Sequence, residues 1–313
     1  MKIMVMGSGG VGAYYGGLLA GQGQDVTFIA RGAHLQALRT TGLQAKSIHG
    51  DFNLVPAKAT DKPADAGVVD LILFCVKTFD TDEAAKAILP AVSPQTAVTS
   101  LQNGVDAPER IGKIVGAEHV LGGMTQISSA IEAPGVVKQV SQFRRIVFGE
   151  LDGSISARIR SIEGAFKNTG ITVEITQDIR KVLWTKLVFI SAASGLGSLT
   201  RLPMGEYRSV PETRAMIVDL MREVEAIARA QGIALDADVV KKSLKFFDDA
   251  APHMKASMQL DVAAGRKTEL ESMVGVVGRK GRELGIPTPV ADFVYASLLP
   301  IERKAQNGPS PAP

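Results

Sequence analysis

Cysteine is almost absent from this sequence: Cys75 is the one thiol in 313 residues. A single cysteine excludes an internal disulfide framework and is typical of proteins from a reducing compartment. Cys75 lies within the apolar segment VDLILFCVK, residues 69–77. Because thiols buried among apolar side chains are usually inert, we interpret Cys75 as a core residue and not as a reactive one.

Clusters of like charge and metal-ligand patterns are also missing. The 35 basic and 32 acidic residues are interspersed and give a net charge of +3. Since no run of Lys and Arg stands out, a nucleic-acid-binding or membrane-surface protein is disfavoured. The histidines lack the spacing of zinc ligands, so we expect no metal site; they are His34, His49, His119 and His253.

Targeting and membrane-spanning signals are the third absence. After Met1 and Lys2 the chain enters IMVMG and then a glycine cluster, and this apolar run is too short for a signal peptide. No apolar stretch is expected to reach the roughly 18 to 20 residues that cross a bilayer. The sequence therefore favours a cytoplasmic protein without a membrane partner. Its last stretch, AQNGPSPAP at 305–313, is rich in proline and polar residues and is expected to fray.

The first half of the chain contains short apolar runs that alternate with helical periodicity. Runs this continuously apolar, joined by helices, indicate a parallel sheet covered on both faces, as in α/β proteins. The segment 43–60 differs and predicts a hairpin-like insertion. Helices are expected at 13–23, 34–42, 81–92 and 155–170, and strands of the sheet at 2–7, 25–30, 69–76, 96–104, 118–131, 135–140, 144–151 and 171–176.

The first of these runs leads into GSGGVG, which places Gly7, Gly9 and Gly12 between a strand and a helix. In this context glycines permit a tight turn, let a pyrophosphate approach the backbone amides, and let helix and strand pack closely. We interpret the motif as a dinucleotide-binding loop. The second strand, DVTFIA, is followed by Arg31 with no acidic residue nearby, and arginine suits a 2′-phosphate through forked hydrogen bonds. NADP is therefore the expected cofactor.

From about Gln177 onward, strand signals disappear and helical periodicity replaces them. A long helix over 179–200 is expected to loosen at Gly195 and Gly197. We predict a dinucleotide-binding domain at 1–176, followed by an all-helical substrate domain at 177–313. The apolar stripes of the helices fit a homodimer and core packing equally well. Further helices are expected at 210–232, 237–251, 253–265, 267–285 and 288–305.

Several spaced motifs follow one another in order: GSGGVGAYYGGLLA, VTFIARGAHLQAL, VKTFDT, SLQNGVDAPERI, GGMTQISSAIEAPGVV, WTKL and SMQLDVAAGRKTELE. As a set they resemble the ketopantoate reductase family (2-dehydropantoate 2-reductase), and the resemblance covers nearly the whole chain. It implies a Rossmann-like domain joined to a helical substrate domain. It also implies NADPH-dependent reduction of a 2-oxo acid to a 2-hydroxy acid, which in the family supplies pantoate for pantothenate synthesis.

The resemblance also implies roles for individual residues. Lys186 of WTKL matches the catalytic lysine, and Glu269 of GRKTELE matches the glutamate that binds the substrate hydroxyl and assists the lysine. Asn103 of LQNG and Lys77 of VKTFD match residues beside the nicotinamide and the substrate. Ser257 of ASMQLD matches a serine that contacts the substrate carboxylate. A strand end, a turn and a helix start also account for Lys77, Asn103 and Glu269 without chemistry.

Lys186 stands in WTKLVFISAAS, residues 184–194, an otherwise apolar run. From the residues alone, a lysine that extends to water and a lysine held for a substrate are both open. The family role favours the second, because hydride addition builds negative charge on an oxygen and a fixed cation in a dry site stabilises that charge. Apolar neighbours also lower the pKa of an ammonium group and make it a better acid.

Two positions depart from the family pattern. The family has asparagines four and eight residues after the catalytic lysine, where this chain has Ile190 and Ser194. Because a spacing of four keeps side chains on one helix face, Ile190 presents hydrocarbon where a substrate hydroxyl expects a partner. An unpaired hydroxyl costs on the order of 1 to 3 kcal/mol. The substitution favours a 2-oxo acid with an apolar group at that place.

The leading hypothesis is therefore an NADPH-dependent reductase whose small-molecule substrate is ketopantoate. One alternative is a reductase of the same build that acts on another 2-oxo acid. Another is an NADP-binding protein without catalysis, against which the presence of both Lys186 and Glu269 argues. A metal-independent beta-hydroxyacid dehydrogenase fits the ordered motifs less well.

Overall fold

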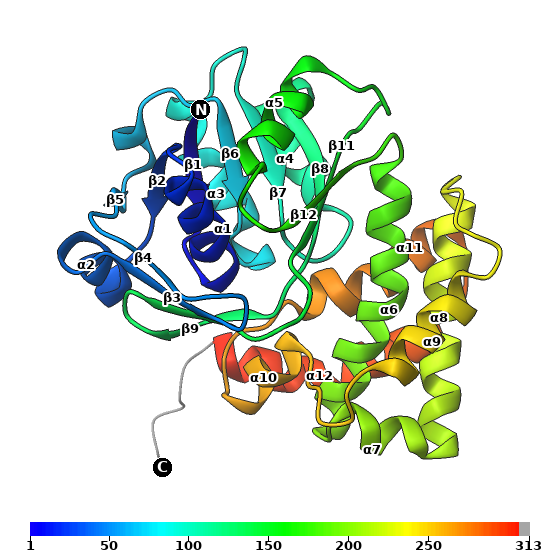
Figure 1. The fold of residues 1–313 in the computed structure, drawn as a ribbon. Coiled ribbons are helices and arrows are strands. Elements are labelled where there is room, and N and C mark those ends of the chain that lie inside the picture. Colours follow the sequence, from blue (N-terminus) through cyan, green and yellow to red (C-terminus); the bar gives the residue numbers. More distant parts are fainter. Residues whose placement is uncertain (307–313) are drawn as a thin grey trace. The chain divides into compact units, whose positions relative to one another are not determined.

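The computed structural model describes residues 1–306. Of the segment 305–313 that was expected to fray, Ala305 and Gln306 belong to the last helix, contrary to that expectation, and the rest lies outside the described residues. The chain divides into two compact units (Figure 1). The first unit consists of residues 1–102 and 106–179. The second consists of Asn103–Val105 and the chain from Arg180 on. The expected domain boundary at residue 176 stays a prediction.

The first unit is built on an eight-stranded sheet with the order β12-β11-β8-β7-β6-β1-β2-β5. All neighbouring strands are parallel except β8 and β11, which pair antiparallel. The predicted α/β sheet is therefore confirmed. Its strands are β1 (Lys2–Met6), β2 (Asp25–Ile29), β5 (Ala59–Thr60), β6 (Leu71–Phe74), β7 (Ala97–Ser100), β8 (Val120–Gln126), β11 (Arg145–Glu150) and β12 (Thr172–Ile175).

Alternate residues of the central strands enter two separate hydrophobic cores, one on each face of the sheet. Ile3 and Val5 of β1 pack in the core that contains residues of α1, α2 and α5. Met4 and Met6 pack in the core that contains residues of α3 and α4. This period of two explains why these strands are apolar at nearly every position. The helices are α1 (Gly10–Gly21), α2 (Gly32–Thr40), α3 (Thr81–Ala87), α4 (Ala107–Val115) and α5 (Ala157–Phe166), with short helices η1 (Pro63–Ala66), η2 (Thr78–Asp80), η3 (Leu89–Ala91) and η4 (Ala117–His119).

A second, smaller sheet has the order β4-β3-β10-β9. The predicted insertion at 43–60 supplies an antiparallel hairpin of β3 (Leu43–Ser47) and β4 (Phe52–Leu54). The expectation that 118–131 and 135–140 extend the main sheet was wrong in part, because β9 (Ser129–Ala133) and β10 (Val136–Gln139) join this second sheet. The reason is visible in the burial, since β9 is mostly exposed and β10 buries alternate positions, as a sheet with one wet face requires.

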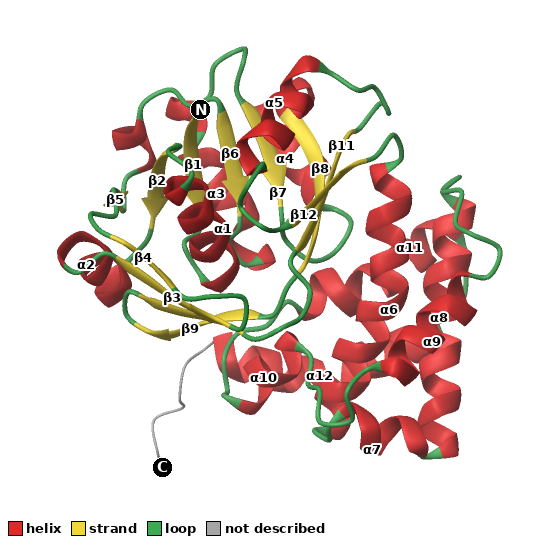
Figure 2. Cartoon of the chain, in the orientation of Figure 1, coloured by secondary structure: helices red, strands yellow, loops and turns green. Residues whose placement is uncertain are grey.

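The second unit consists of helices and connecting loops, with no strand among its described residues, as predicted (Figure 2). Its core gathers apolar side chains from its long helices, among them Leu187, Leu220 and Val294. Two helices were not expected from the sequence, α4 in the first unit and the short α7. The elements are α6 (Ile179–Thr200), α7 (Met204–Ser209), α8 (Pro211–Ala230), α9 (Val239–Asp249), α10 (Ser257–Ala263), a π-helical turn (Glu271–Gly275), α11 (Val276–Leu284) and α12 (Pro289–Gln306).

Helix α6 runs without a break, so the expected loosening at Gly195 and Gly197 was wrong. Both glycines lie where neighbouring groups approach the helix closely. A Cβ on Gly195 would lie 3.0 Å from a methyl carbon of Val294, and one on Gly197 would lie 2.8 Å from Oε1 of Gln259. These glycines therefore serve close packing and not flexibility.

By length and composition α6 also meets the criteria for a membrane span, contrary to the sequence expectation. Its 22 residues include an 18-residue window with a mean hydropathy of 1.4. However, 67% of that window is buried inside the protein, and core helices of soluble proteins meet the same criteria. We therefore describe α6 as the core helix of the second unit.

Candidate active site

The three predicted glycines of the loop between β1 and α1 have three different structural roles. Gly7 has a φ of +98°, which side chains other than hydrogen rarely permit. A Cβ on Gly12 would lie 2.2 Å from the carbonyl oxygen of Gly7, so this glycine allows helix and strand to touch. At Gly9, by contrast, no atom of the described chain lies within 4 Å of the Cβ position apart from Gly9 and its two chain neighbours. The open space lies at the start of α1, where a pyrophosphate would fit.

A fourth glycine was not singled out from the sequence. A Cβ on Gly10 would lie 2.3 Å from the carbonyl oxygen of Ser129, and the Ser129 hydroxyl donates a 2.9 Å hydrogen bond to the Gly10 carbonyl. Strand β9 thus packs directly on the first turn of α1. The sequence signal that could have revealed this contact is the pair of adjacent glycines in GSGGVG. Gly9 faces open space, whereas Gly10 faces strand β9.

Arg31 and Lys77 both follow strands that neighbour β1. Arg31 is the exposed N-cap residue of α2, two positions after the end of β2, and Lys77 is the N-cap residue of η2 after β6. Since β2, β1 and β6 are parallel neighbours, both residues and the glycine loop lie at the same edge of the sheet. This edge, at the carboxyl ends of the strands, is where such sheets bind dinucleotides. Their roles toward a cofactor stay predictions.

Three predicted site residues meet in the second unit. The ammonium group of Lys186 on α6 donates a 2.9 Å hydrogen bond to Oδ1 of Asn103. The same Asn103 donates from Nδ2 to Oε2 of Glu269 over 3.4 Å. Asn103 therefore connects the lysine and the glutamate, although these residues are far apart in the sequence. A cation, an amide and a carboxylate are brought together in one hydrogen-bonded group.

The surroundings of Lys186 change its acidity. The side chain retains some exposed surface, yet the protein around its nitrogen displaces enough water to lower the pKa of Lys186 from 10.5 to about 8. The charge of Glu269 opposes this effect and raises the pKa. Desolvation dominates, as expected for an ammonium group in an apolar helix. Lys186 is therefore mostly protonated at neutral pH and gives up its proton more readily than an ordinary lysine.

The remaining predicted residues take varied positions in the second unit. Ile190 lies one helical turn after Lys186 and is half-buried. Ser194 lies a further turn along, is fully buried, and its hydroxyl has no hydrogen-bond partner within residues 1–306. Ser257 is the exposed first residue of α10. The structure thus joins Lys186, Asn103 and Glu269 and continues the α6 face with one apolar and one hydroxyl side chain.

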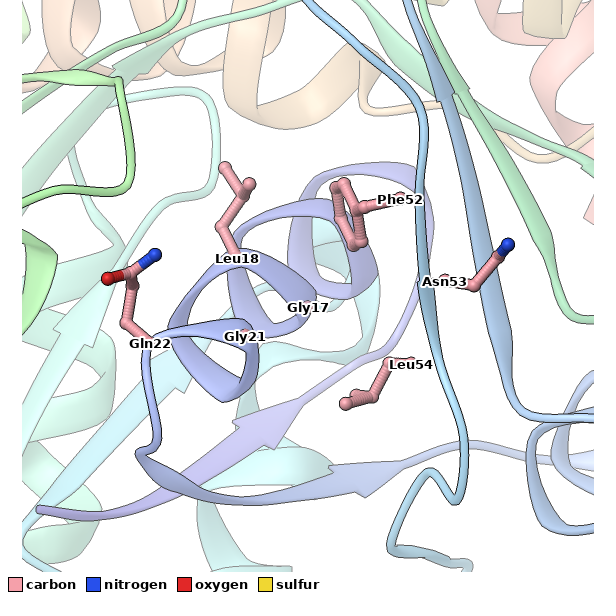
Figure 3. A pocket seen from close by; sticks show the side chains of 7 residues that line it. All are labelled: Gly17, Leu18, Gly21, Gln22, Phe52, Asn53 and Leu54. Carbon is pink, nitrogen blue, oxygen red and sulfur yellow. The ribbon is translucent and has the colours of Figure 1, made fainter.

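A pocket of about 250 Å³ lies in the first unit beside the second half of α1. Figure 3 shows Phe52 and Leu54 of β4 next to the helix, which presents Gly17 and Gly21. A Cβ on Gly17 would lie 2.6 Å from the Phe52 ring, so this glycine lets the ring approach the helix. None of the predicted site residues lines this pocket. We do not include it in the candidate site.

The open space at Gly9 gives a prediction for cofactor binding. Gly9→Val should weaken NADPH binding by at least about tenfold, because its side chain fills the space next to the first amides of α1. Fluorescence titration with NADPH measures the affinity. Gly21→Val is the matched control, since a Cβ at Gly21 also meets no atom of residues 1–306 but lies at the far end of α1. Equal NADPH affinity in the two variants would contradict this assignment.

The lowered pKa of Lys186 gives a prediction for stability. Because its folded pKa lies below the unfolded value, the unfolded chain holds more protons between about pH 8 and 10.5, and the charged lysine destabilises the native state fully below pH 8. Lys186→Met should raise the free energy of unfolding at pH 7 by roughly 1 to 3 kcal/mol. The gain should shrink as the pH rises above 8.

Urea unfolding at several pH values measures this difference. Lys181→Met is the control on the same helix, because Lys181 forms an ion pair with Asp236 at 2.6 Å and its side chain is 37% exposed. That variant should not gain stability. A loss of stability in Lys186→Met at neutral pH would show that burial of the ammonium group is not costly.

Comparison with known proteins agrees with this fold. A family model described as ketopantoate reductase PanE/ApbA matches residues 3–153, and one described as ketopantoate reductase PanE/ApbA C terminal matches residues 178–302. The chain is 31% identical to the uncharacterized oxidoreductase YkpB of Bacillus subtilis (strain 168), over 95% of this chain and 98% of that protein.

Solved structures are similar over the same length. The PanE/ApbA family ketopantoate reductase from Ralstonia eutropha JMP134 is 32% identical, with a TM-score of 0.90 over 98% of this chain and 100% of that one. A ternary structure of D-mandelate dehydrogenase with NADH and anilino(oxo)acetate has a TM-score of 0.90, with coverage of 98% and 100%, but is 24% identical and shows the fold alone. The chain belongs to the ketopantoate reductase PanE/ApbA family of oxidoreductases.

Proposed function

We propose that this protein reduces 2-dehydropantoate (ketopantoate) to pantoate with NADPH, a step that supplies pantothenate synthesis. The observation that carries the proposal is the hydrogen-bonded group of Lys186, Asn103 and Glu269 in a chain of the ketopantoate reductase family. Reduction of a carbonyl requires a group that stabilises negative charge on the oxygen and then donates a proton. A cation with a lowered pKa, oriented by an amide, can do both.

Lys186 acts on the substrate oxygen in this proposal. A nicotinamide cofactor, when bound, supplies the hydride to the carbonyl carbon. As negative charge develops on the carbonyl oxygen, the Lys186 ammonium group donates a hydrogen bond to it and then transfers a proton. Its pKa of about 8 lies close to neutral pH, where an acid is effective both as a donor and in the correct protonation state.

Asn103 and Glu269 control the lysine. The Oδ1 of Asn103 accepts a hydrogen bond from Lys186 and so fixes the direction of the ammonium group. The Glu269 carboxylate raises the pKa of Lys186 against the larger effect of desolvation, which keeps the lysine charged before the reaction. Glu269 is itself only 5% exposed. It also remains an acceptor for a substrate hydroxyl, since a carboxylate has several acceptor positions.

The choice of NADPH rests on Arg31. The guanidinium group is exposed at the start of α2, at the same sheet edge as the glycine loop. An exposed arginine at this place is suited to a 2′-phosphate, whereas the 2′-hydroxyl of NADH is usually bound by an acidic side chain. The named mandelate dehydrogenase structure contains NADH, so both cofactors belong in the binding assay.

The half-buried Ile190 favours a second candidate, a reductase of a different and more apolar 2-oxo acid. Ile190 lies one turn from Lys186 and offers no hydrogen bond to a substrate hydroxyl. The buried Ser194 hydroxyl is a turn further on. Because the mandelate dehydrogenase of the same fold carries anilino(oxo)acetate, phenylglyoxylate is a suitable apolar compound to compare.

A panel of 2-oxo acids tests the reaction directly. NADPH oxidation, followed by absorbance, should be fastest with 2-dehydropantoate, and Lys186→Ala should lower kcat by about 10²- to 10⁴-fold while NADPH affinity is retained. A faster reaction with phenylglyoxylate, or with the analogue of 2-dehydropantoate that lacks the terminal hydroxyl, would replace the first candidate by the second. NADPH binding without turnover of any compound would indicate a non-catalytic NADP-binding protein.

Substitution of Ile190 tests the cause of the preference. Ile190→Asn introduces an amide where the family has one, so the ratio of kcat/KM for 2-dehydropantoate to that for its hydroxyl-free analogue should rise about tenfold. Ile190→Leu keeps a hydrocarbon side chain of equal volume and should leave the ratio unchanged. If Ile190→Asn and Ile190→Leu give the same ratio of the two kcat/KM values in steady-state kinetics, Ile190 does not determine the substrate preference.

A further inference from the structure

Glu269 lies in a segment that connects α10 to the π-helical turn Glu271–Gly275. Side-chain hydrogen bonds help to fix the course of this connection. The guanidinium group of Arg266 donates two hydrogen bonds, of 2.9 and 2.7 Å, to Oδ1 of Asp261 on α10. This ion pair closes the outer, exposed end of the segment.

The inner end of the segment is fixed by Glu302 on α12. Oε2 of Glu302 accepts hydrogen bonds from the backbone N–H of Thr268 at 2.9 Å and from its hydroxyl at 2.6 Å. Oε1 accepts a further bond from Gln306 at 2.9 Å. Thr268 and Glu302 are 6% and 7% exposed, so these bonds lie in the interior of the second unit.

The bonds from Glu302 act on the residue directly before Glu269. The hydroxyl of Thr268 also accepts a 3.2 Å hydrogen bond from the backbone N–H of Leu270, so it ties the residues on both sides of Glu269. The carbonyl of Glu269 in turn accepts from the N–H groups of Ser272 and Met273, each at 3.1 Å. The backbone at Glu269 therefore has little freedom to turn.

The turn that follows is bonded to the helix that carries the lysine. The hydroxyl of Ser191 on α6 donates a 2.7 Å hydrogen bond to the carbonyl of Met273, in the middle of the π-helical turn. π-helical turns are frequent at functional sites. Ser191 is five residues after Lys186 on α6. Helix α6 therefore carries the lysine and also bonds to the π-helical turn that follows Glu269.

A buried carboxylate is costly unless its oxygens are hydrogen-bonded. Glu302 satisfies this condition with Gln306 on one oxygen and, on the other, two hydrogen bonds from Thr268, which is 34 positions earlier in the chain. We infer that Glu302 is a positioning residue, which fixes through Thr268 the backbone from which Glu269 presents its carboxylate to Asn103. The catalytic meaning of this position rests on the proposed function.

A matched control exists on a helix that is bonded to the start of α12. Glu223 of α8 is 8% exposed and accepts hydrogen bonds of 2.8 and 2.9 Å from the N–H groups of Val290 and Ala291 at the start of α12. Both glutamates are thus buried and accept two bonds from one neighbouring segment. Only Glu302 binds next to Glu269.

The experiment compares Glu302→Gln with Glu223→Gln in the full-length protein. Glu302→Gln should lower kcat by about ten- to a hundredfold, the effect of a small misplacement of a catalytic group, with KM for NADPH unchanged. Both variants should lower the midpoint of unfolding by similar amounts, but Glu223→Gln should keep the kcat of the parent protein. Unchanged kcat in Glu302→Gln, or an equal loss in Glu223→Gln, would overturn the inference.

Two threonine variants cover the case in which Glu302→Gln does not fold. Thr268→Ser keeps the hydroxyl and should retain kcat. Thr268→Val keeps the shape and the backbone bond to Glu302 but loses the hydroxyl's bonds to Glu302 and Leu270, and it should show a loss of kcat like that of Glu302→Gln. If Thr268→Val turns over as fast as Thr268→Ser, the hydroxyl does not position Glu269.

A chemical measurement separates this inference from the proposed function. Acylation of Lys186 by an N-hydroxysuccinimide ester, followed by peptide mass spectrometry, needs no substrate. Displacement of the Glu269 carboxylate removes a charge that keeps Lys186 protonated, so Glu302→Gln should acylate faster than both the parent and Glu223→Gln. Absence of turnover with every 2-oxo acid would refute the proposed function alone. Equal acylation rates in all three proteins would refute the positioning role.

Discussion

The candidate site is built around one physical conflict, the placement of the Lys186 ammonium group among apolar side chains of α6. Removal of water lowers the pKa of Lys186 to about 8, and the charge of Glu269 acts in the opposite direction. Asn103 stands between the two and is hydrogen-bonded to both. A helix built only for stability would have no reason to keep this charge. The destabilisation caused by this buried charge is explained if the lysine stabilises negative charge on a substrate oxygen and then releases a proton.

In the proposed function, the first unit meets a different requirement, the approach of an anionic cofactor to a backbone. Its parallel sheet, buried on both faces, brings Gly7, Arg31 and Lys77 to one edge. Within the glycine loop each glycine meets a separate geometric demand, a positive φ at Gly7 and close packing at Gly12. Gly9 alone leaves open space. An anion site of this kind needs no charged side chain at its centre, because the first amides of a helix provide the positive potential.

Much of the fold could be predicted from the sequence, because the periodicity of apolar residues and the Gly and Pro residues at element ends are local signals. Continuous apolar runs gave the parallel sheet, and the alternation of Ile3, Met4, Val5 and Met6 between two cores shows why. The second sheet was missed, since the choice of partner for β9 and β10 depends on contacts far apart in the chain. Gly195 and Gly197 were misjudged for a similar reason, because their role is set by the neighbours Val294 and Gln259. The family resemblance identified Lys186, Asn103 and Glu269, but their mutual hydrogen bonds and the support from Thr268 and Glu302 required three dimensions.

The central claim concerns the ionisation of one side chain, so the most direct test is a titration of that side chain. Protein labelled with ¹³C at the lysine ε-carbon, assigned with Lys186→Met, can be followed by NMR as the pH is raised. The account predicts that the Lys186 signal titrates with a pKa of about 8, well below the value of an ordinary lysine. A Lys186 signal that titrates with the exposed lysines near pH 10.4 would contradict the account.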